Sequence, residues 1–172
     1  MTYKVSAEEL LERGAHFGHQ SKRWNPKMGE YLYGEEGGVH VFYLIKTKKL
    51  LEEALEFLKN SAKEKKTILF VGCKKQAQDK TREVAEATES SYFTERWLGG
   101  TITNFDQIKK SIKKLAEMKA KMAADEYASF TKKERLLIDR EIARLERYFG
   151  GISRLEKIPD VLVVVDTHKE TS

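Results

Sequence analysis

The feature of this sequence that most constrains its fold is a series of short apolar runs separated by helical segments. Residues 67–72 do not alternate between apolar and polar residues, as a strand with one solvent-exposed face would. A continuous apolar run of this kind is typical of a parallel strand that is buried on both faces. A helix is predicted over about 75–88, and residues 91–94 and 160–166 are predicted as further strands. With a strand predicted over 39–45 and a helix over about 47–62, the order from residue 39 to residue 94 is strand, helix, strand, helix, strand, which predicts an α/β fold with an open parallel sheet.

The N-terminal part is predicted to begin with a short helix and to continue as a long loop. Ser6 followed by Glu9 is a capping box, which places a helix at about 7–14. Glycine, asparagine and proline punctuate residues 14–38, and the aromatic content of this segment indicates a functional loop and not disorder. Within it, residues 31–33 are a candidate short strand. Residues 39–45 are then predicted as a buried strand, followed by a helix over about 47–62.

The segment after residue 103 departs from the α/β rhythm and predicts a helical hairpin. A helix over about 104–124 carries an apolar seam, and a second capping box at Thr131 and Glu134 begins a helix that ends at Phe149. Gly150 and Gly151 are predicted to supply a left-handed C-cap. We expect an antiparallel, coiled-coil-like insert of residues 104–149 in an α/β domain of residues 1–103 and 150–172. Few residues follow the last strand, so this domain is predicted to be incomplete at its C-terminus.

The charge balance favours an anionic partner, and the composition argues against several other classes. Lys and Arg number 32 against 27 Asp and Glu, for a net charge of +5 and a pI of about 9.1. The single cysteine, Cys73, excludes an intrachain disulfide and a multi-cysteine zinc site, and predicts a cytoplasmic protein. No apolar run reaches the ~18 residues of a membrane span. The acidic start lacks the apolar core of a signal peptide.

Cations interleaved with indole rings are the strongest functional signal, because cations neutralise phosphate and aromatic rings stack on unpaired bases. Residues 21–27 and residues 96–100 both have this pattern. The alternative for Trp97 is a buried anchor of its loop. Lys74 and Lys75 open a helix after a strand, where an α/β sheet binds phosphate, but the glycine-rich nucleotide fingerprints are missing.

Two histidines form an H-x-x-H pair, His16 and His19, which could meet a metal ion if the segment were helical. Gly18 argues against a regular helix, and the alternative is hydrogen-bonded loop histidines. No nucleophile elbow, catalytic triad or paired-carboxylate motif stands out, so the chain is not predicted to be an enzyme.

Several blocks in order along the chain resemble the bacterial-type ribosomal protein S2 family of the small subunit. They are residues 14–20 (GAHFGHQ), 24–28 (WNPKM), 96–105 (RWLGGTITNF) and 149–152 (FGGI). The resemblance implies a flavodoxin-like or Rossmann-like sheet with an inserted helical hairpin. It also implies binding to small-subunit ribosomal RNA, docking of the large mRNA-binding protein S1 beside other ribosomal proteins, and no catalysis. No cofactor is predicted, apart from the metal ion considered for His19. The RNA-binding residues predicted from both lines of reasoning are Lys22, Arg23, Trp24, Asn25, Lys27, Lys74, Lys75, Gln76, Arg96, Trp97, Gly99, Gly100, Thr103 and Asn104.

The sequence departs from the family pattern at two places. Tyr43 stands where Asp or Asn is expected, and residues 166–169 (DTHK) replace a more usual Asp-Pro-Arg-Lys. Family members also continue well beyond Ser172. If His19 belongs to a metal site, its carboxylate partners would lie beyond that residue.

Two other functions remain open from the sequence. One is a small nucleotide-binding α/β protein that uses residues 72–76. The other is a coiled-coil adaptor with residues 108–149 as its interface.

Overall fold

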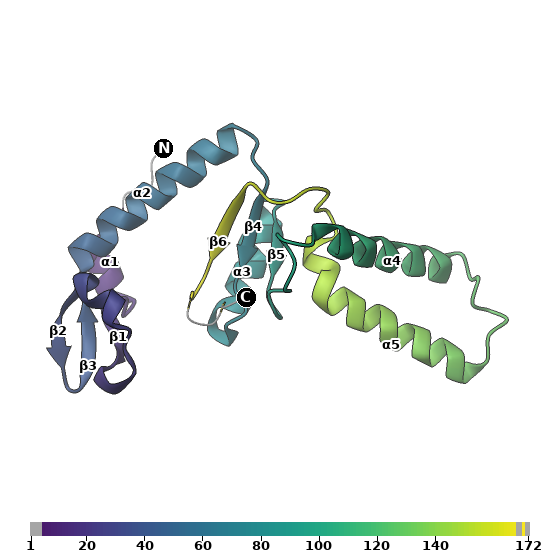
Figure 1. The fold of residues 1–172 in the computed structure, drawn as a ribbon, viewed down its shortest axis with the longest axis horizontal. Helices are drawn as coiled ribbons and strands as arrows, with labels where there is room; N and C mark the ends of the chain where they lie inside the picture. Colours follow the sequence, from purple (N-terminus) through teal and green to yellow (C-terminus); the bar gives the residue numbers. More distant parts are fainter. Residues whose placement is uncertain (1–4, 168–169, 171–172) are drawn as a thin grey trace. The chain divides into compact units, whose positions relative to one another are not determined.

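The computed structural model describes residues 5–167 and 170, and the chain divides into two compact units, Met1–Glu64 and Lys65–Ser172 (Figure 1). This division differs from the predicted one, in which residues 1–103 and 150–172 form one domain around an insert of 104–149. That domain assignment stays a prediction. Of the departures from the family pattern, His168 and Lys169 lie outside the described residues.

The first unit contains a three-stranded antiparallel sheet where the sequence predicts a loop. After helix α1 (Ala7–Glu12), strands β1 (Phe17–Gln20), β2 (Leu32–Glu36) and β3 (Val39–Phe42) pair in the order β1-β3-β2. The loop prediction for residues 14–38 is therefore wrong over β1, whereas the candidate short strand at 31–33 overlaps β2, which extends further, to Glu36. These strands expose most of their residues, so they lack the apolar run or alternation by which a strand is recognised.

Strand β3 forms where it is predicted, but in a different sheet. It is central and antiparallel, with Val41 opposite Phe17 on β1 and Gly34 on β2. Its residues are half-buried, so the prediction of a buried parallel strand is wrong. The strand ends at Phe42, because helix α2 (Leu44–Lys63) begins three residues earlier than predicted.

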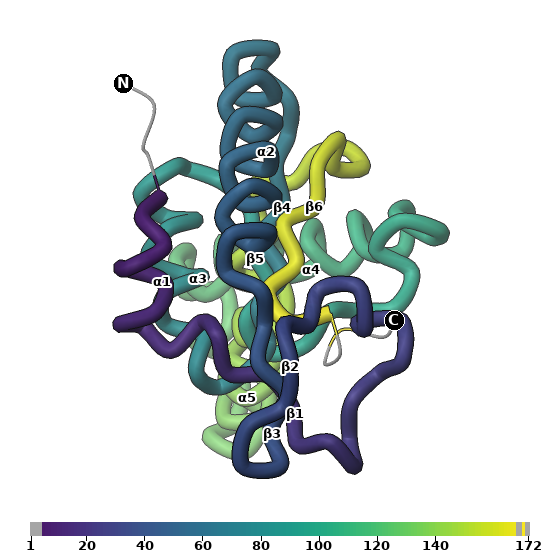
Figure 2. The backbone as a smooth tube through the Cα atoms, turned by 90° about the vertical axis from the view of Figure 1, so that its left-hand side faces the viewer, coloured from purple at the N-terminus to yellow at the C-terminus, as the bar shows by residue number. Residues whose placement is uncertain are grey.

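The predicted parallel sheet is confirmed in the second unit. Strands β4 (Ile68–Val71), β5 (Ser91–Phe93) and β6 (Val161–Val164) pair in the order β5-β4-β6, and helix α3 (Lys75–Ala87) connects β4 to β5. Figure 2 shows β6 beside β4, with the chain between them passing through the helical region. The last strand thus pairs with one more than 90 residues before it, as the register Ile68 to Val161 shows.

The core of this unit lies between the sheet and the beginning of the helical region. Leu69, Val71 and Ile152 are fully buried, and Phe93 and Ile108 pack in the same cluster. Cys73 is also buried there, as predicted for a small residue after a buried strand. Burial of apolar surface of this kind is the main favourable term in the stability of the unit.

Helices α4 (Phe105–Ala123) and α5 (Lys132–Phe149) lie side by side, as the seam pattern predicts (Figure 1). Leu115 on α4 and Leu145 on α5 are buried. Lys114 Nζ lies 2.9 Å from Glu141 Oε1, and Lys119 pairs with Glu146, so ion pairs join the two helices. The capping box at Thr131 is present.

The predicted left-handed cap after α5 is wrong. Gly150 has φ −56° and ψ −46°, and residues Gly150–Ile152 form a 3-10 turn. The glycines serve close packing instead, because a Cβ atom on Gly151 would overlap the Tyr92 carbonyl oxygen.

Candidate nucleic-acid interface

The first candidate surface is the segment from Ser21 to Lys27 in the first unit. A 3-10 turn, Ser21–Arg23, is tied to the β2–β3 turn, because the Ser21 hydroxyl donates to the Gly38 carbonyl oxygen at 3.0 Å. Lys22 and Arg23 are exposed on this turn, as is Lys27. Three cations therefore face solvent within six residues, on backbone that the sheet holds in place.

Trp24 and Asn25 have structural contacts as well as exposure. The Trp24 ring lies 4.8 Å from the His40 ring between centroids, and 37% of the residue remains exposed. The Asn25 side chain accepts a hydrogen bond from Lys27 N at 3.0 Å and caps the turn Pro26–Tyr31. Asn25 is thus used locally, and Trp24 keeps part of its ring available.

Exposed aromatic residues near this segment were missed by sequence reasoning. Tyr33 and Tyr43 stack with their rings 7° from parallel and centroids 6.1 Å apart, although they are 77% and 41% exposed. Phe17 is 66% exposed. An exposed pair of this kind offers faces for base stacking. Neither tyrosine stands beside a cation in the sequence, and the pairing depends on β2 approaching the start of α2.

A second candidate surface lies where the parallel strands end. Lys74 Nζ lies 2.5 Å from Asp166 Oδ2, and the Cys73 amide donates to Glu170 Oε1 at 3.0 Å. Gln78 Nε2 donates to the Thr94 carbonyl oxygen at 2.7 Å and joins the turns after β4 and β5. Two carboxylates of the chain therefore occupy the turn that a nucleotide phosphate would need, which disfavours the nucleotide-binding alternative. Of the predicted residues here, Lys75 and Gln76 are exposed, and Lys74 is held by Asp166.

The third candidate surface is a groove of about 470 Å³ between α4, α5 and the turn after β5. Arg96 lines it together with Lys114 and Arg144. Glu141 accepts hydrogen bonds from Lys114 and Arg144, both at 2.9 Å, and these bonds, that from Arg144 above all, lower the pKa of its carboxyl group. The lining of the groove thus contains three cations and one carboxylate, and the groove is net positive.

The loop after Arg96 is built mainly for packing. Trp97 is half-buried against the core cluster, which supports the alternative of a loop anchor. Thr101 is 1% exposed, and its hydroxyl donates to the Leu98 carbonyl oxygen at 2.6 Å. Gly100 takes a positive φ of 84°, which a side chain rarely adopts. Of the other predicted residues, Gly99, Thr103 and Asn104 are exposed.

The predicted metal ligand, His19, lies exposed on β1. Within residues 5–167 and at 170, no group of three or more His, Cys, Asp or Glu side chains is placed to hold a metal ion. The role of His19 stays a prediction. The same described part of the chain contains no helix that is both long and apolar enough to cross a bilayer.

Comparison with known proteins gives one consistent result. The family model described as "Ribosomal protein S2" matches residues 10–172. A curated relative, the small ribosomal subunit protein uS2 of Petrotoga mobilis (strain DSM 10674 / SJ95), is 45% identical over 166 residues. The match covers 96% of this chain and 58% of that relative, so the chain spans less than two thirds of its length.

Proposed function

The chain belongs to the ribosomal protein S2 family, and on that premise we propose that it is a non-catalytic constituent of the small ribosomal subunit that binds ribosomal RNA. Its place is then the ribosome of the cytoplasm, and its role in translation is positional. It holds RNA and protein neighbours in a fixed relation and changes no covalent bond.

The observation that carries this proposal is the positive groove lined by Arg96, Lys114 and Arg144. Phosphate groups dominate the affinity of proteins for nucleic acid, and arginine binds them through two parallel N–H donors. Lys114 and Arg144 are already oriented by Glu141, so little side-chain freedom is lost when a phosphate binds between them. Arg96 also lines the groove, so that with Lys114 and Arg144 against Glu141 two positive charges are left unbalanced.

The Ser21 to Lys27 segment supports the same function in the first unit. Lys22 and Arg23 supply charge beside the half-covered ring of Trp24. The stacked pair Tyr33 and Tyr43 adds aromatic faces. Stacking of a base on a side chain contributes about 1–3 kcal/mol and tolerates any sequence, so we expect recognition of RNA shape more than of base identity.

The finer parts of the proposal concern the fold of the complete protein and its protein partners. We propose a flavodoxin-like sheet with α4 and α5 as an inserted hairpin, and contacts to neighbouring ribosomal proteins that include S1. Leu136 and Leu137 on α5 support a protein contact, because they are 49% and 54% exposed. A metal at His19 remains a further proposal, for which residues beyond this chain would supply the carboxylates.

The coiled-coil adaptor alternative is less well supported. Its apolar seam is used inside the chain, where Ile108, Leu115 and Leu145 are buried. The ion pairs from Lys114 and Lys119 to α5 are also internal.

The test is the salt dependence of binding to small-subunit ribosomal RNA. Arg96→Ala and Lys22→Ala are each expected to weaken binding and to lower the slope of log K against log salt by about 1, because each removes one phosphate contact. Lys80→Ala is the matched control, since it removes one charge that is already paired with Glu83 at 2.7 Å. An unchanged affinity and slope in both test variants would remove these residues from the interface.

Assembly tests the proposal as a whole. The chain is mixed with small subunits depleted of their S2-family protein, and co-sedimentation is followed at increasing salt. Saturable, stoichiometric rebinding that weakens with salt is the expected result. If the full-length relative rebinds and this chain does not, docking needs the part that the relative has in addition.

A further inference from the structure

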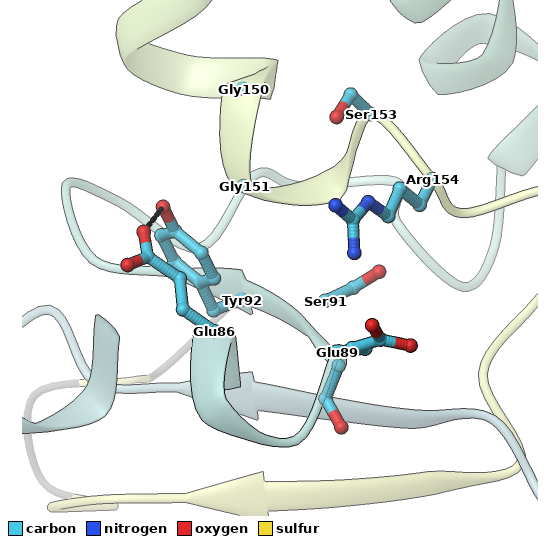
Figure 3. Close-up of a pocket in the computed structure, with 9 residues that line it drawn as sticks. Glu86, Glu89, Ser91, Tyr92, Gly150, Gly151, Ser153 and Arg154 are labelled. Carbon is cyan, nitrogen blue, oxygen red and sulfur yellow. Dashed lines mark hydrogen bonds between the residues drawn. The ribbon is translucent and has the colours of Figure 1, made fainter. Parts of the chain in front are cut away.

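A small pocket in the second unit lies apart from the three surfaces described above. It has a volume of about 230 Å³ and is lined by the end of α3, by β5 and by the glycine turn after α5. Figure 3 shows Tyr92 and Glu86 on one side, and Arg154 with Ser91, Ser153 and Glu89 on the other. The volume lies below the range of about 300–1,000 Å³ that holds a drug-sized ligand, so the pocket suits a group the size of one ring system.

Two of its charged side chains have no ionic partner within the described residues. Arg154 and Glu89 both line the pocket, yet they form no ion pair with each other or with any other group described. Charges of opposite sign that share a small site without pairing leave a guanidinium donor and a carboxylate acceptor available to a ligand. The side of the pocket opposite Tyr92 and Glu86 therefore presents both a donor, Arg154, and an acceptor, Glu89.

Glu86 and Tyr92 are, in contrast, already occupied with each other. The Tyr92 hydroxyl donates to Glu86 Oε1 at 3.1 Å. Burial raises the pKa of Tyr92, and the hydrogen bond to Glu86 adds to this effect, so the hydroxyl stays protonated and keeps its role as donor. This pair forms a fixed wall of the pocket and leaves Glu89 as the available carboxylate.

The backbone at Glu89 is strained. Glu89 has a φ of 51°, in the left-handed region, at the position after the C-cap of α3. The Ser90 amide donates to the Ala85 carbonyl oxygen at 2.8 Å, which completes a Schellman motif. Glycine is the usual residue at this position, because a side chain costs energy there. The motif turns the chain at the end of α3 and places Glu89 beside the pocket.

From this arrangement we propose that the pocket binds one unpaired guanine base of RNA. Guanine presents two adjacent acceptors, O6 and N7, which match the two-pronged donor of Arg154. Its N1–H and N2–H donors lie on the neighbouring edge and match the two oxygens of Glu89. Single-stranded bases that are splayed out of a helix are recognised on these edges.

The charges of the pocket argue against other ligands. With Glu86 and Glu89 against Arg154, the site has a net negative charge, which repels a phosphate group. An arginine or lysine from a protein partner would meet the Arg154 guanidinium. Adenine would turn an acceptor, N1, toward the carboxylate of Glu89, and the pyrimidines offer at most one amino donor. Guanine satisfies both charged groups at once and adds no charge of its own.

The inference rests on the proposed function, and its test separates the two. Binding of the chain is measured by fluorescence anisotropy with labelled uridine hexamers that contain one central guanosine, adenosine or cytidine. The guanosine hexamer is expected to bind about five- to hundredfold more tightly, since a good bidentate pair contributes about 1–3 kcal/mol of discrimination. Salt-dependent binding of ribosomal RNA is measured alongside.

Two variants in which the substituted side chain is close in size to the original are compared with the unchanged chain. Arg154→Lys keeps the positive charge but loses the two parallel N–H donors of the guanidinium group. Glu89→Gln keeps the size of the side chain but loses the charged acceptor. Each is expected to abolish most of the guanosine preference and to leave the binding of the adenosine hexamer within about twofold, as expected when only base contacts are lost. Circular dichroism confirms that both variants are folded, and Ser153→Ala serves as a neutral change in the same pocket.

Each outcome decides the inference. Equal binding of the three hexamers, or a guanosine preference that survives in both variants, overturns it while the proposed function stands. If the unchanged chain binds none of the hexamers and no ribosomal RNA, the proposed function is overturned as well.

Discussion

Gly151 packs directly against Tyr92, so that a Cβ atom at position 151 would overlap the Tyr92 carbonyl oxygen and lie 2.7 Å from the ring carbons Cδ2 and Cε2. The two residues come from β5 and from the turn after α5, which are almost sixty residues apart in the sequence. Their contact attaches the helical region to the edge of the sheet. The obstacle is backbone, which cannot move aside as the end of a flexible side chain can.

Gly151→Ala is therefore expected to destabilise the chain by about 1–3 kcal/mol, the usual effect of overpacking. The matched control is Gly99→Ala, because a Cβ atom at Gly99 meets nothing within 4 Å. Urea unfolding at equilibrium measures both. Equal stability of the two variants would show that the turn at Gly151 relaxes freely.

A substitution just after the C-terminus of α4 is expected to stabilise the folded chain. Asp125 has a φ of 56° and follows the C-cap Ala124, and the Glu126 amide donates to the Lys121 carbonyl oxygen at 3.1 Å. Asp125→Gly is expected to stabilise the chain by about 1 kcal/mol, because glycine adopts left-handed backbone without steric cost. Asp125→Ala keeps that cost and is expected to give no gain. Thermal unfolding distinguishes them, and a gain from alanine equal to that from glycine would contradict the strain argument.

The turns after β4 and β5 depend on one amide side chain. Gln78 Nε2 donates to the Thr94 carbonyl oxygen at 2.7 Å and to the Cys73 carbonyl oxygen at 3.3 Å. Gln78→Glu places a carboxylate against both carbonyl oxygens and is expected to cost about 1–3 kcal/mol. Gln76→Glu, at an exposed position of the same helix, is the control with the same change in charge. A similar loss of stability in both variants would mean that charge, and not the lost donor, is responsible.

Asp160 gives the stability a defined pH dependence. Its Oδ2 accepts from the Thr67 amide at 2.8 Å and from Lys157 Nζ at 3.0 Å, and these contacts, that with Thr67 first, lower the pKa of the carboxyl group. A carboxyl group with a lowered pKa in the folded state stabilises fully above its ordinary value of 3.8 and loses this effect as the pH falls through the folded value.

The measurement is the free energy of unfolding as a function of pH for the unchanged chain and for Asp160→Asn. The difference between them is expected to be largest near neutral pH and to shrink below pH 3.8. A difference that stays constant over this range would show that the lost stability comes from packing and not from ionisation.

Much of the second unit could be predicted from local patterns. The apolar run at Ile68–Val71 and the seam that includes Ile108 and Leu115 place their elements correctly, because burial of those faces requires those periods. The first unit could not be predicted in the same way. Its strands β1 and β2 are mostly exposed, so their sequences carry little pattern, and they exist as strands because β3 supplies hydrogen-bond partners on both edges.

The candidate sites show the same contrast. The exposure of Lys22 and Arg96 agrees with their predicted place on the surface, although their contact with RNA stays a prediction. The local use of Asn25 as a cap and the ion pair of Lys74 with Asp166 were not predicted. A residue type and its neighbours in the sequence indicate what a side chain can bind, but not which group of the same chain reaches it first.

By itself, then, the sequence determined the helices, the parallel strands and the membership of the family, because periodic burial and ordered motifs are properties of neighbouring residues. The tertiary structure alone decided the antiparallel sheet, the positive groove at Arg96 and the pocket that joins Glu89 to Arg154. Each of these brings together residues that are distant in the sequence. Their interactions depend on separations in space of a few ångströms, which the order of residues along a chain does not specify.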